Sequence, residues 1–265
     1  MTMALEMLTV GPTSERPPLL FVHGSFCGAW IWAEHFLPYF AEAGWQCAAV
    51  SLRGHGGSDG RDALDSHSLA DYTADVVEVA QSLGRAPVLI GHSLGGMVAQ
   101  RAACRTGVAG LALLAAVGPG GIGSAFTHMS LRHPSLLWQL GRLQTLGPEA
   151  VDYEVVRRGL FSDDFPPEQA YAYVPRFQRE SQLATNELLM PQWFHLMPRP
   201  AIPALVLGGS RDAFIPYGDL ALAATYWAAD MKVVDGMPHV MMLDTTWKQA
   251  ADPLSGWLNQ RFTGR

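Results

Sequence analysis

The chain has 265 residues, 49% of them hydrophobic, and a formal net charge of −6 at pH 7. This apolar content is enough to bury one large core, and the negative charge argues against a nucleic-acid partner, because phosphate binding needs clustered lysine and arginine. Three cysteines, Cys27, Cys47 and Cys104, form no spaced pattern, so we expect neither a metal site nor a disulfide framework.

Short apolar runs alternate with helical patterns along the chain. The runs predicted as strands are 19–22, 47–50, 88–90, 111–117, 204–207 and 232–234, with one or two antiparallel edge strands within 5–10. The helical patterns are 32–43, 68–83, 94–105, 219–227 and 247–262, with Gly44 and Gly84 as C-terminal stops of the first two. This alternation predicts an α/β fold with a mostly parallel sheet flanked by helices.

The alternation breaks between Gly118 and Pro203, where further helical patterns occupy 136–146, 151–160, 168–179 and 185–193. We therefore expect a core of residues 1–122 and 200–265 and an inserted helical cap of residues 123–199. The cap is expected above the carboxyl ends of the strands, where ligands bind in such folds.

Gly91-His92-Ser93-Leu94-Gly95 falls where a predicted strand turns into a predicted helix, which indicates a nucleophile elbow. The glycines let neighbouring backbone pass without a Cβ clash, and the tight turn pushes the serine hydroxyl out of the sheet. Backbone N–H groups at the start of the following helix face the oxygen on which negative charge develops. The alternative is a glycine-rich turn with a structural serine.

A serine needs a base and a group that orients the base. Asp212 follows the predicted strand 204–207, and His239 follows the predicted strand 232–234. We expect Asp212 to accept a hydrogen bond from one ring nitrogen of His239, while the other nitrogen takes the proton of Ser93. The chain order of serine, acid and histidine is the order that the α/β-hydrolase topology requires.

Other candidates lack this setting. His92 adjoins the serine, but neighbours in a sharp turn point in different directions, which favours a packing role. Asp219 and Asp235 are typical turn or cap residues. No matching strand end precedes the remaining histidines considered, which are His55, His67, His128, His133 and His195.

These features resemble the α/β-hydrolase superfamily over nearly the whole chain. The resemblance implies that the loop from His23 to Trp32 completes an oxyanion hole, in which the backbone N–H groups of Ser25 and Leu94 stabilise the tetrahedral oxyanion by about 3–4 kcal/mol each. An ordinary turn after a core strand is the alternative. Ser93 also differs from the aspartate that haloalkane dehalogenases and epoxide hydrolases of this fold carry at that place.

The same loop is similar to that of plant methyl-ester esterases and hydroxynitrile lyases, which carry a His-x-x-x-x-Gly-Ala-Trp-x-Trp pattern. The lyases have a threonine and a lysine where this chain has Gly24 and Val240, so the resemblance favours ester hydrolysis. The stretch Arg53-Gly54-His55-Gly56-Gly57-Ser58 instead looks like a turn of bacterial hydrolases. The plant substrates are therefore not carried over.

The sequence thus predicts a cofactor-free serine hydrolase that cleaves small-molecule carboxylic esters and prefers apolar, uncharged ones. The alternatives are a carbon–carbon bond hydrolase or lyase on the same scaffold and a non-catalytic small-molecule binder. Candidate pocket residues are Phe26, Trp138, Trp193 and Phe194, although apolar cap surfaces first serve packing.

Met1 to Pro18 lacks a basic start followed by an apolar stretch, and no run approaches the length of a membrane span. We therefore expect a soluble, cytoplasmic protein. The oligomeric state is left open.

Overall fold

The computed structural model describes residues 3–192 and 198–263. These residues include a seven-stranded sheet with the order β1-β3-β2-β4-β5-β6-β7. The strands are β1 (Met7–Val10), β2 (Leu19–Val22), β3 (Cys47–Val50), β4 (Val88–His92), β5 (Gly110–Leu114), β6 (Ala204–Gly209) and β7 (Asp230–Val234). Only β1, on the edge, pairs antiparallel to its neighbour within this sheet, which confirms the predicted mostly parallel arrangement.

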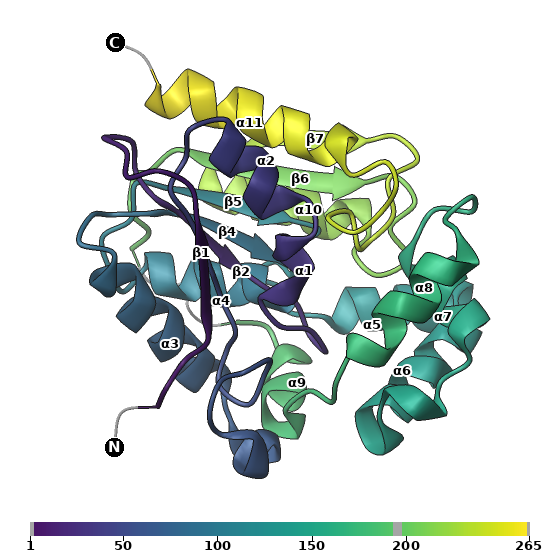
Figure 1. Cartoon of the computed structure of the whole chain (residues 1–265). Helices are drawn as coiled ribbons and strands as arrows, with labels where there is room; N and C mark the ends of the chain where they lie inside the picture. Colours follow the sequence, from purple (N-terminus) through teal and green to yellow (C-terminus); the bar gives the residue numbers. More distant parts are fainter. Residues whose placement is uncertain (1–2, 193–197, 264–265) are drawn as a thin grey trace.

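Helices cover both faces of the sheet (Figure 1). One face carries α1 (Trp30–Ala33), α2 (Phe36–Glu42) and α11 (Lys248–Phe262), and the other carries α3 (Leu69–Ser82), α4 (Leu94–Ala103) and α10 (Tyr217–Trp227). Successive strand residues point to opposite faces, so Phe21 packs in the first core and Leu20 in the second. Burial on both faces explains why the central strands are continuous apolar runs.

Several element boundaries differ from the predicted ones. The helix predicted over 32–43 is divided into α1 and α2, because His35 takes a non-helical φ of −132°. The strand predicted over 111–117 ends at Leu114, where Ala115 turns to a φ of +44°. Residues 115–117 remain buried without strand pairing, so burial alone keeps the run apolar. Gly44 and Gly84 follow α2 and α3 with positive φ, as predicted.

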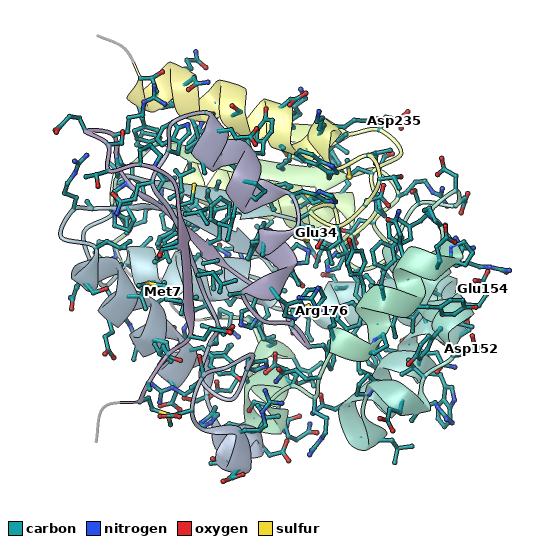
Figure 2. The ribbon with its side chains drawn as sticks, in the orientation of Figure 1. Met7, Glu34, Asp152, Glu154, Arg176 and Asp235 are labelled. Atoms are coloured by element: carbon teal, nitrogen blue, oxygen red, sulfur yellow. The ribbon has the colours of Figure 1, made fainter. Side chains whose placement is uncertain are left out.

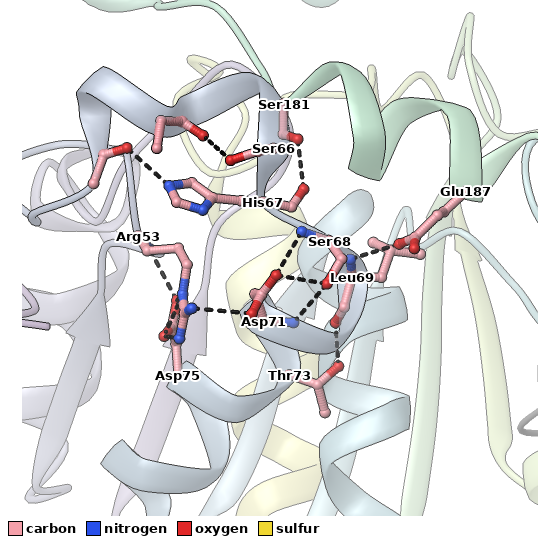
Figure 3. Close-up of polar contacts among 12 residues, drawn as sticks. Arg53, Ser66, His67, Ser68, Leu69, Asp71, Thr73, Asp75, Ser181 and Glu187 are labelled. Carbon is pink, nitrogen blue, oxygen red and sulfur yellow. Dashed lines mark hydrogen bonds and ion pairs between the residues drawn. The ribbon is translucent and has the colours of Figure 1, made fainter. Parts of the chain in front are cut away.

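The start of α3 illustrates how local sequence sets an element. Asp71 N–H donates to Ser68 Oγ at 3.1 Å, and Ser68 N–H donates to Asp71 Oδ2 at 2.9 Å, which forms a capping box (Figure 3). Arg53, in the turn after β3, adds an ion pair to Asp75 at 2.6 Å. The turn of residues 53–58 is thereby attached to α3.

Between β5 and β6 the described chain forms α5 (Gly123–Arg132), α6 (Pro134–Leu146), α7 (Tyr153–Leu160), α8 (Pro167–Tyr173) and α9 (Gln182–Leu188), which we call the inserted helices. Short 3-10 turns η2 (Pro148–Ala150) and η3 (Val174–Arg176) lie among them, and η1 (Arg61–Ser66) follows β3. Figure 1 shows α5 to α8 at the side of the sheet toward which β4 and β6 point.

The sequence patterns predicted helices that overlap α6 to α9 but missed α5, which buries Ala125 and Met129. None of the helices in the described ranges has the length and apolar character needed to cross a lipid bilayer.

Candidate active site

Ser93 lies at the turn from β4 to α4 with φ +52° and ψ −120°, a strained conformation for a residue with a side chain. Its N–H donates to the carbonyl of Leu114 at 3.2 Å, which holds the turn. A Cβ on Gly91 would lie 2.5 Å from the Gly95 carbonyl oxygen, and one on Gly95 would lie 2.2 Å from that of His23. The turn therefore needs glycine at both places.

Asp212 and His239 come together in the loops that follow β6 and β7. His239 Nδ1 lies 2.9 Å from Asp212 Oδ2, and the two side chains are 6% and 1% exposed. Asp212 Oδ1 also accepts the backbone N–H groups of Phe214 at 2.7 Å and Ile215 at 3.0 Å. Because a carboxylate only accepts, His239 donates from Nδ1, which leaves Nε2 as the acceptor of a proton.

Two further rings enclose His239. The Phe214 ring stacks on the His239 ring with the ring centroids 4.3 Å apart. The His92 ring is tilted by 50° to the His239 ring, with the centroids 4.7 Å apart. His92 Nε2 donates to the His239 carbonyl at 3.0 Å. Burial and the neighbouring His239 hold the pKa of His92 well below its ordinary value, so His92 is a neutral donor. Sequence reasoning missed Phe214, which has no pattern beyond its place two residues after Asp212.

Through His92, the elbow that carries Ser93 contacts the histidine loop. No hydrogen bond joins Ser93 Oγ to the ring of His239 among the interactions of the described residues. Such contacts often tighten only when substrate binds, so this geometry is compatible with proton transfer between the two side chains.

The backbone N–H groups of Ser25 and Leu94 donate to no other group in the described parts of the chain. Leu94 opens α4, where helix N–H groups lack partners within the helix. Gly24 brings the Ser25 loop against the elbow, since a Cβ on Gly24 would lie 3.0 Å from Ser93 Cβ. Two unpaired donors thus flank the serine, and together they can bind a negatively charged oxygen.

His23 fixes the beginning of this loop. Its Nδ1 donates to the Gly24 carbonyl at 2.8 Å, and its Nε2 accepts the N–H of Leu52 at 3.0 Å. Complete burial and the charge of nearby His55 lower the pKa of His23 to about 3, which keeps the ring neutral. A neutral imidazole can serve both as donor and as acceptor, as this position requires.

The rival carboxylates lie elsewhere. Asp235 is exposed, accepts a hydrogen bond from Ser210 Oγ at 2.8 Å, and lies at the outer edge of the molecule (Figure 2). Asp219 accepts from Ser124 Oγ at 2.5 Å. Neither carboxylate contacts His239.

The predicted pocket residues have different environments. Phe26 is half-buried in the loop beside Ser25, whereas Trp138 on α6 is 68% exposed. Trp193 and Phe194 lie outside the described residues. A surface cavity of about 640 Å³ opens between η1 and residues 177–179, and Ser93, Asp212 and His239 do not line it.

The chain matches the alpha/beta hydrolase family over residues 19–252 and belongs to that family. It is 26% identical to the non-heme chloroperoxidase of Streptomyces lividans over 263 residues, which cover 85% of this chain and 86% of that protein. It is 34% identical to epoxide hydrolase 4 of Mus musculus over 222 residues, 76% of this chain but 61% of that protein.

A shorter match, 35% identical over 94 residues and 34% of each chain, joins it to the polyneuridine aldehyde esterase of Rauvolfia serpentina. Among solved structures, the esterase EaEST from Exiguobacterium antarcticum superposes with a TM-score of 0.79 at 18% identity, covering 97% of this chain and 96% of that chain. The resemblance and fold class expected from the sequence are thereby confirmed. Family membership supports hydrolase activity on small molecules, while the relatives' names cover several reactions.

Proposed function

We propose that this protein is a serine hydrolase that cleaves carboxylic esters through an acyl-enzyme on Ser93. The observation that carries the proposal is a serine at a strained strand-to-helix turn beside a buried Asp212–His239 pair. Esterases occur among its relatives and among the structures that share its fold, which supports the same reading. The three residues would form a catalytic triad and need no cofactor.

In the first step, Ser93 Oγ attacks the ester carbonyl while His239 Nε2 takes the proton of the serine hydroxyl. Asp212 holds the imidazole in the required tautomer and stabilises the imidazolium that forms. The carbonyl oxygen becomes negative and is bound by the N–H groups of Ser25 and Leu94. The intermediate then collapses, and the alcohol leaves with the proton from His239.

In the second step, water attacks the acyl-enzyme. His239 takes a proton from the water and returns it to Ser93 Oγ when the carboxylic acid leaves. The same two N–H groups stabilise the second oxyanion, so one set of donors serves both half-reactions.

We further propose that residues 123–199 act as a cap over a core formed by residues 1–122 and 200–265. Met129 and Leu136 of the inserted helices pack against Ala213, and half-buried Phe214 joins this apolar cluster while stacking on His239. The surface that reaches the proposed base is therefore apolar. This supports a preference for apolar, uncharged esters, with about 0.8 kcal/mol gained for each methylene buried.

The environment of three arginines in the inserted region supports esters over anionic diketo acids, which carbon–carbon hydrolases bind and which require a cation above the pocket. Arg157 and Arg158 both pair with Glu154. Arg176 lies between α1 and α8, with its guanidinium 4.1 Å from the centre of the Trp30 ring (Figure 2). These arginines are already engaged by protein groups.

The test compares the wild type with Ser93→Ala, using a fluorophosphonate probe and p-nitrophenyl esters of increasing acyl length. We expect Ser93→Ala to lose both labelling and turnover while its thermal unfolding stays that of the wild type. Ser124→Ala, which removes an exposed hydroxyl on α5, is the matched control and should retain both. Full activity in Ser93→Ala would overturn the serine mechanism. Faster turnover of a vinylogous diketo acid than of any neutral ester would favour carbon–carbon hydrolysis, and a folded wild type that turns over neither would favour a binding protein.

A further inference from the structure

The proposed mechanism leaves the turn of residues 53–58 without a role, although its sequence looks like a turn of bacterial hydrolases. The turn contacts a short segment of the inserted region, residues 177–181 between η3 and α9. We call this segment the strap. We propose that Gln178 of the strap is a positioning residue for the oxyanion loop, residues 23–29. This inference rests on the proposed serine hydrolase function.

The strap contacts the oxyanion loop directly. The backbone N–H of Gln178 donates to the carbonyl of Phe26 at 2.8 Å. Phe26 has a φ of +66° and follows Ser25, whose N–H is one of the two proposed oxyanion donors. A left-handed conformation is unfavourable for a bulky residue and persists only where surrounding contacts enforce it. The strap supplies one such contact from outside the loop.

The side chain of Gln178 fixes the strap to the turn. Its Nε2 donates to the Gly54 carbonyl at 2.9 Å, and its Oε1 accepts the N–H of Gly56 at 3.0 Å. Arg61 adds a longer contact to the same oxygen, at 3.3 Å. One amide group therefore satisfies a donor and an acceptor of the turn while its backbone holds Phe26.

The turn also supports the far end of the oxyanion loop. Ser51, which precedes the turn, accepts the N–H of Ala29 at 2.8 Å and donates to Glu6 at 2.6 Å. Glu6 in turn accepts the N–H of Gly57 at 3.0 Å. The loop is thus held at Ala29 by Ser51, which Glu6 links to the turn, and near its middle by Gln178.

The strap itself is firmly anchored. Glu180 and His55 are both fully buried, with Oε2 and Nε2 3.3 Å apart. Tyr72 OH donates to Glu180 at 2.7 Å. Ser181 Oγ donates to the His67 carbonyl at 2.5 Å (Figure 3). Glu180 thus contacts the turn and α3, and Ser181 contacts the residue that follows η1. These contacts fix the position of Gln178. It can therefore transmit that position to Phe26 and Ser25.

The expected consequence is catalytic and specific to the transition state. Gln178→Ala keeps the backbone N–H but loses the amide that fixes its place, so Ser25 N–H is less well aimed. Complete loss of an oxyanion donor costs about 10²–10³ in rate, and partial misplacement should cost less. We expect kcat to fall about 10- to 100-fold with KM nearly unchanged, because the ground-state carbonyl depends little on these donors.

The experiment measures kcat and KM for a p-nitrophenyl ester and the inhibition constant of a trifluoromethyl ketone, which forms a tetrahedral adduct on serine. In Gln178→Ala the affinity for the ketone should fall by the same factor as kcat/KM. Gln139→Ala is the control, because this half-buried glutamine accepts only the N–H of Asp152 within the inserted helices. It should change neither quantity.

Wild-type kcat and ketone affinity in folded Gln178→Ala would overturn the inference, as would an effect confined to KM. If Gln178→Ala does not fold, Gln178→Glu decides, since it keeps the acceptor for Gly56 and sets a carboxylate oxygen against the Gly54 carbonyl. A loss of kcat/KM with an equal loss of ketone affinity in Gln178→Glu supports the inference, and unchanged kinetics overturn it. Failure of the serine mechanism is separate, because it would appear as retained activity in Ser93→Ala.

Discussion

Two of the polar contacts between the inserted region and the rest of the chain differ in chemistry. At the strap, Glu180 faces His55, so a buried anion from the inserted helices meets a buried imidazole from the turn after β3. Near the histidine loop, Asp244 is fully buried and accepts the N–H of Ser162 at 2.8 Å, its hydroxyl at 2.9 Å and the N–H of Thr246 at 2.9 Å. The first contact pairs two ionisable groups, and the second surrounds one carboxylate with neutral donors.

Each contact adjoins a different half of the proposed machinery. The strap holds the oxyanion loop through Phe26, and the second contact lies beside His239, where Val240 N–H donates to the Leu160 carbonyl at 3.2 Å. The same insertion thus contacts the proposed oxyanion loop on one side and the loop of the proposed base on the other. Only the strap carries a pair whose strength depends on the protonation of both partners.

The largest expected effect comes from Asp212, the residue that orients the proposed base. Asp212→Asn should lower kcat by about 10⁴, because an amide does not fix the tautomer of His239. Steady-state kinetics with a p-nitrophenyl ester measure this loss. Asp235→Asn is the control, since Asp235 is exposed and bonds Ser210. A larger loss in Asp235→Asn would show that the acid has been misassigned.

At the strap, Glu180→Gln should lower the free energy of unfolding by about 3 kcal/mol, because removing one partner of a buried ion pair leaves the other without compensation. Urea unfolding followed by circular dichroism measures the change. The matched control is Asp230→Asn at the start of β7, where an exposed carboxylate pairs with the exposed Arg261 and little change is expected. Equal effects of the two variants would contradict a special role for burial at the strap.

At the second contact, Asp244→Asn should cost about 1–3 kcal/mol, because its NH₂ group would face the donors of Ser162 and Thr246. The same urea measurement applies, with the ester kinetics as a second readout. Because the partners of Asp244 are neutral donors, we expect this loss not to depend on the protonation of His55. A loss that varies with pH in step with that of Glu180→Gln would break the distinction between the two contacts.

The pH dependence of stability should distinguish the strap from the second contact. Burial alone would lower the pKa of His55, but the carboxylate of Glu180 outweighs it, so the pKa of His55 is raised above 6.5. Burial alone would raise the pKa of Glu180, but the charge of His55 and the bonds from Tyr72 and Ser181 outweigh it, so the pKa of Glu180 lies below 4.5.

These pKa shifts determine how the contribution of each group to the free energy of unfolding changes with pH. The His55 contribution is complete below pH 6.5 and is lost as the pH rises through its raised folded pKa. The Glu180 contribution is complete above pH 4.5 and is lost as the pH falls through its lowered folded pKa. The stability difference between wild type and Glu180→Gln should therefore be greatest between these limits. A difference that stays constant from acid to alkaline pH would contradict the ion pair.

The smallest expected effect belongs to a surface pair beside the second contact. Arg211 and Asp163 lie 2.6 Å apart, but their side chains are 44% and 74% exposed. Water and salt screen such pairs, so Arg211→Ala should leave the urea midpoint and the ester kinetics unchanged. A clear loss of stability would show that the second contact also depends on charge.

Much of the fold could be predicted from the sequence because its signals are local. Strand runs such as 19–22 are apolar throughout since both sheet faces are covered, and the glycines around Ser93 mark a turn that admits no Cβ. The contact between Asp212 and His239 also follows from local signals, because parallel strands bring the loops at their carboxyl ends to one edge. Their catalytic roles remain predictions.

The tertiary structure alone decided how the inserted helices return to the core. Gln178 and Gly54 are 124 positions apart, and no periodicity or turn signal relates them. The burial of Glu180 beside His55 is equally invisible in the sequence, because a single glutamate between two predicted helices is normally solvated. Local sequence determines where strands and turns form, whereas contacts between distant loops depend on the packing of all the elements between them.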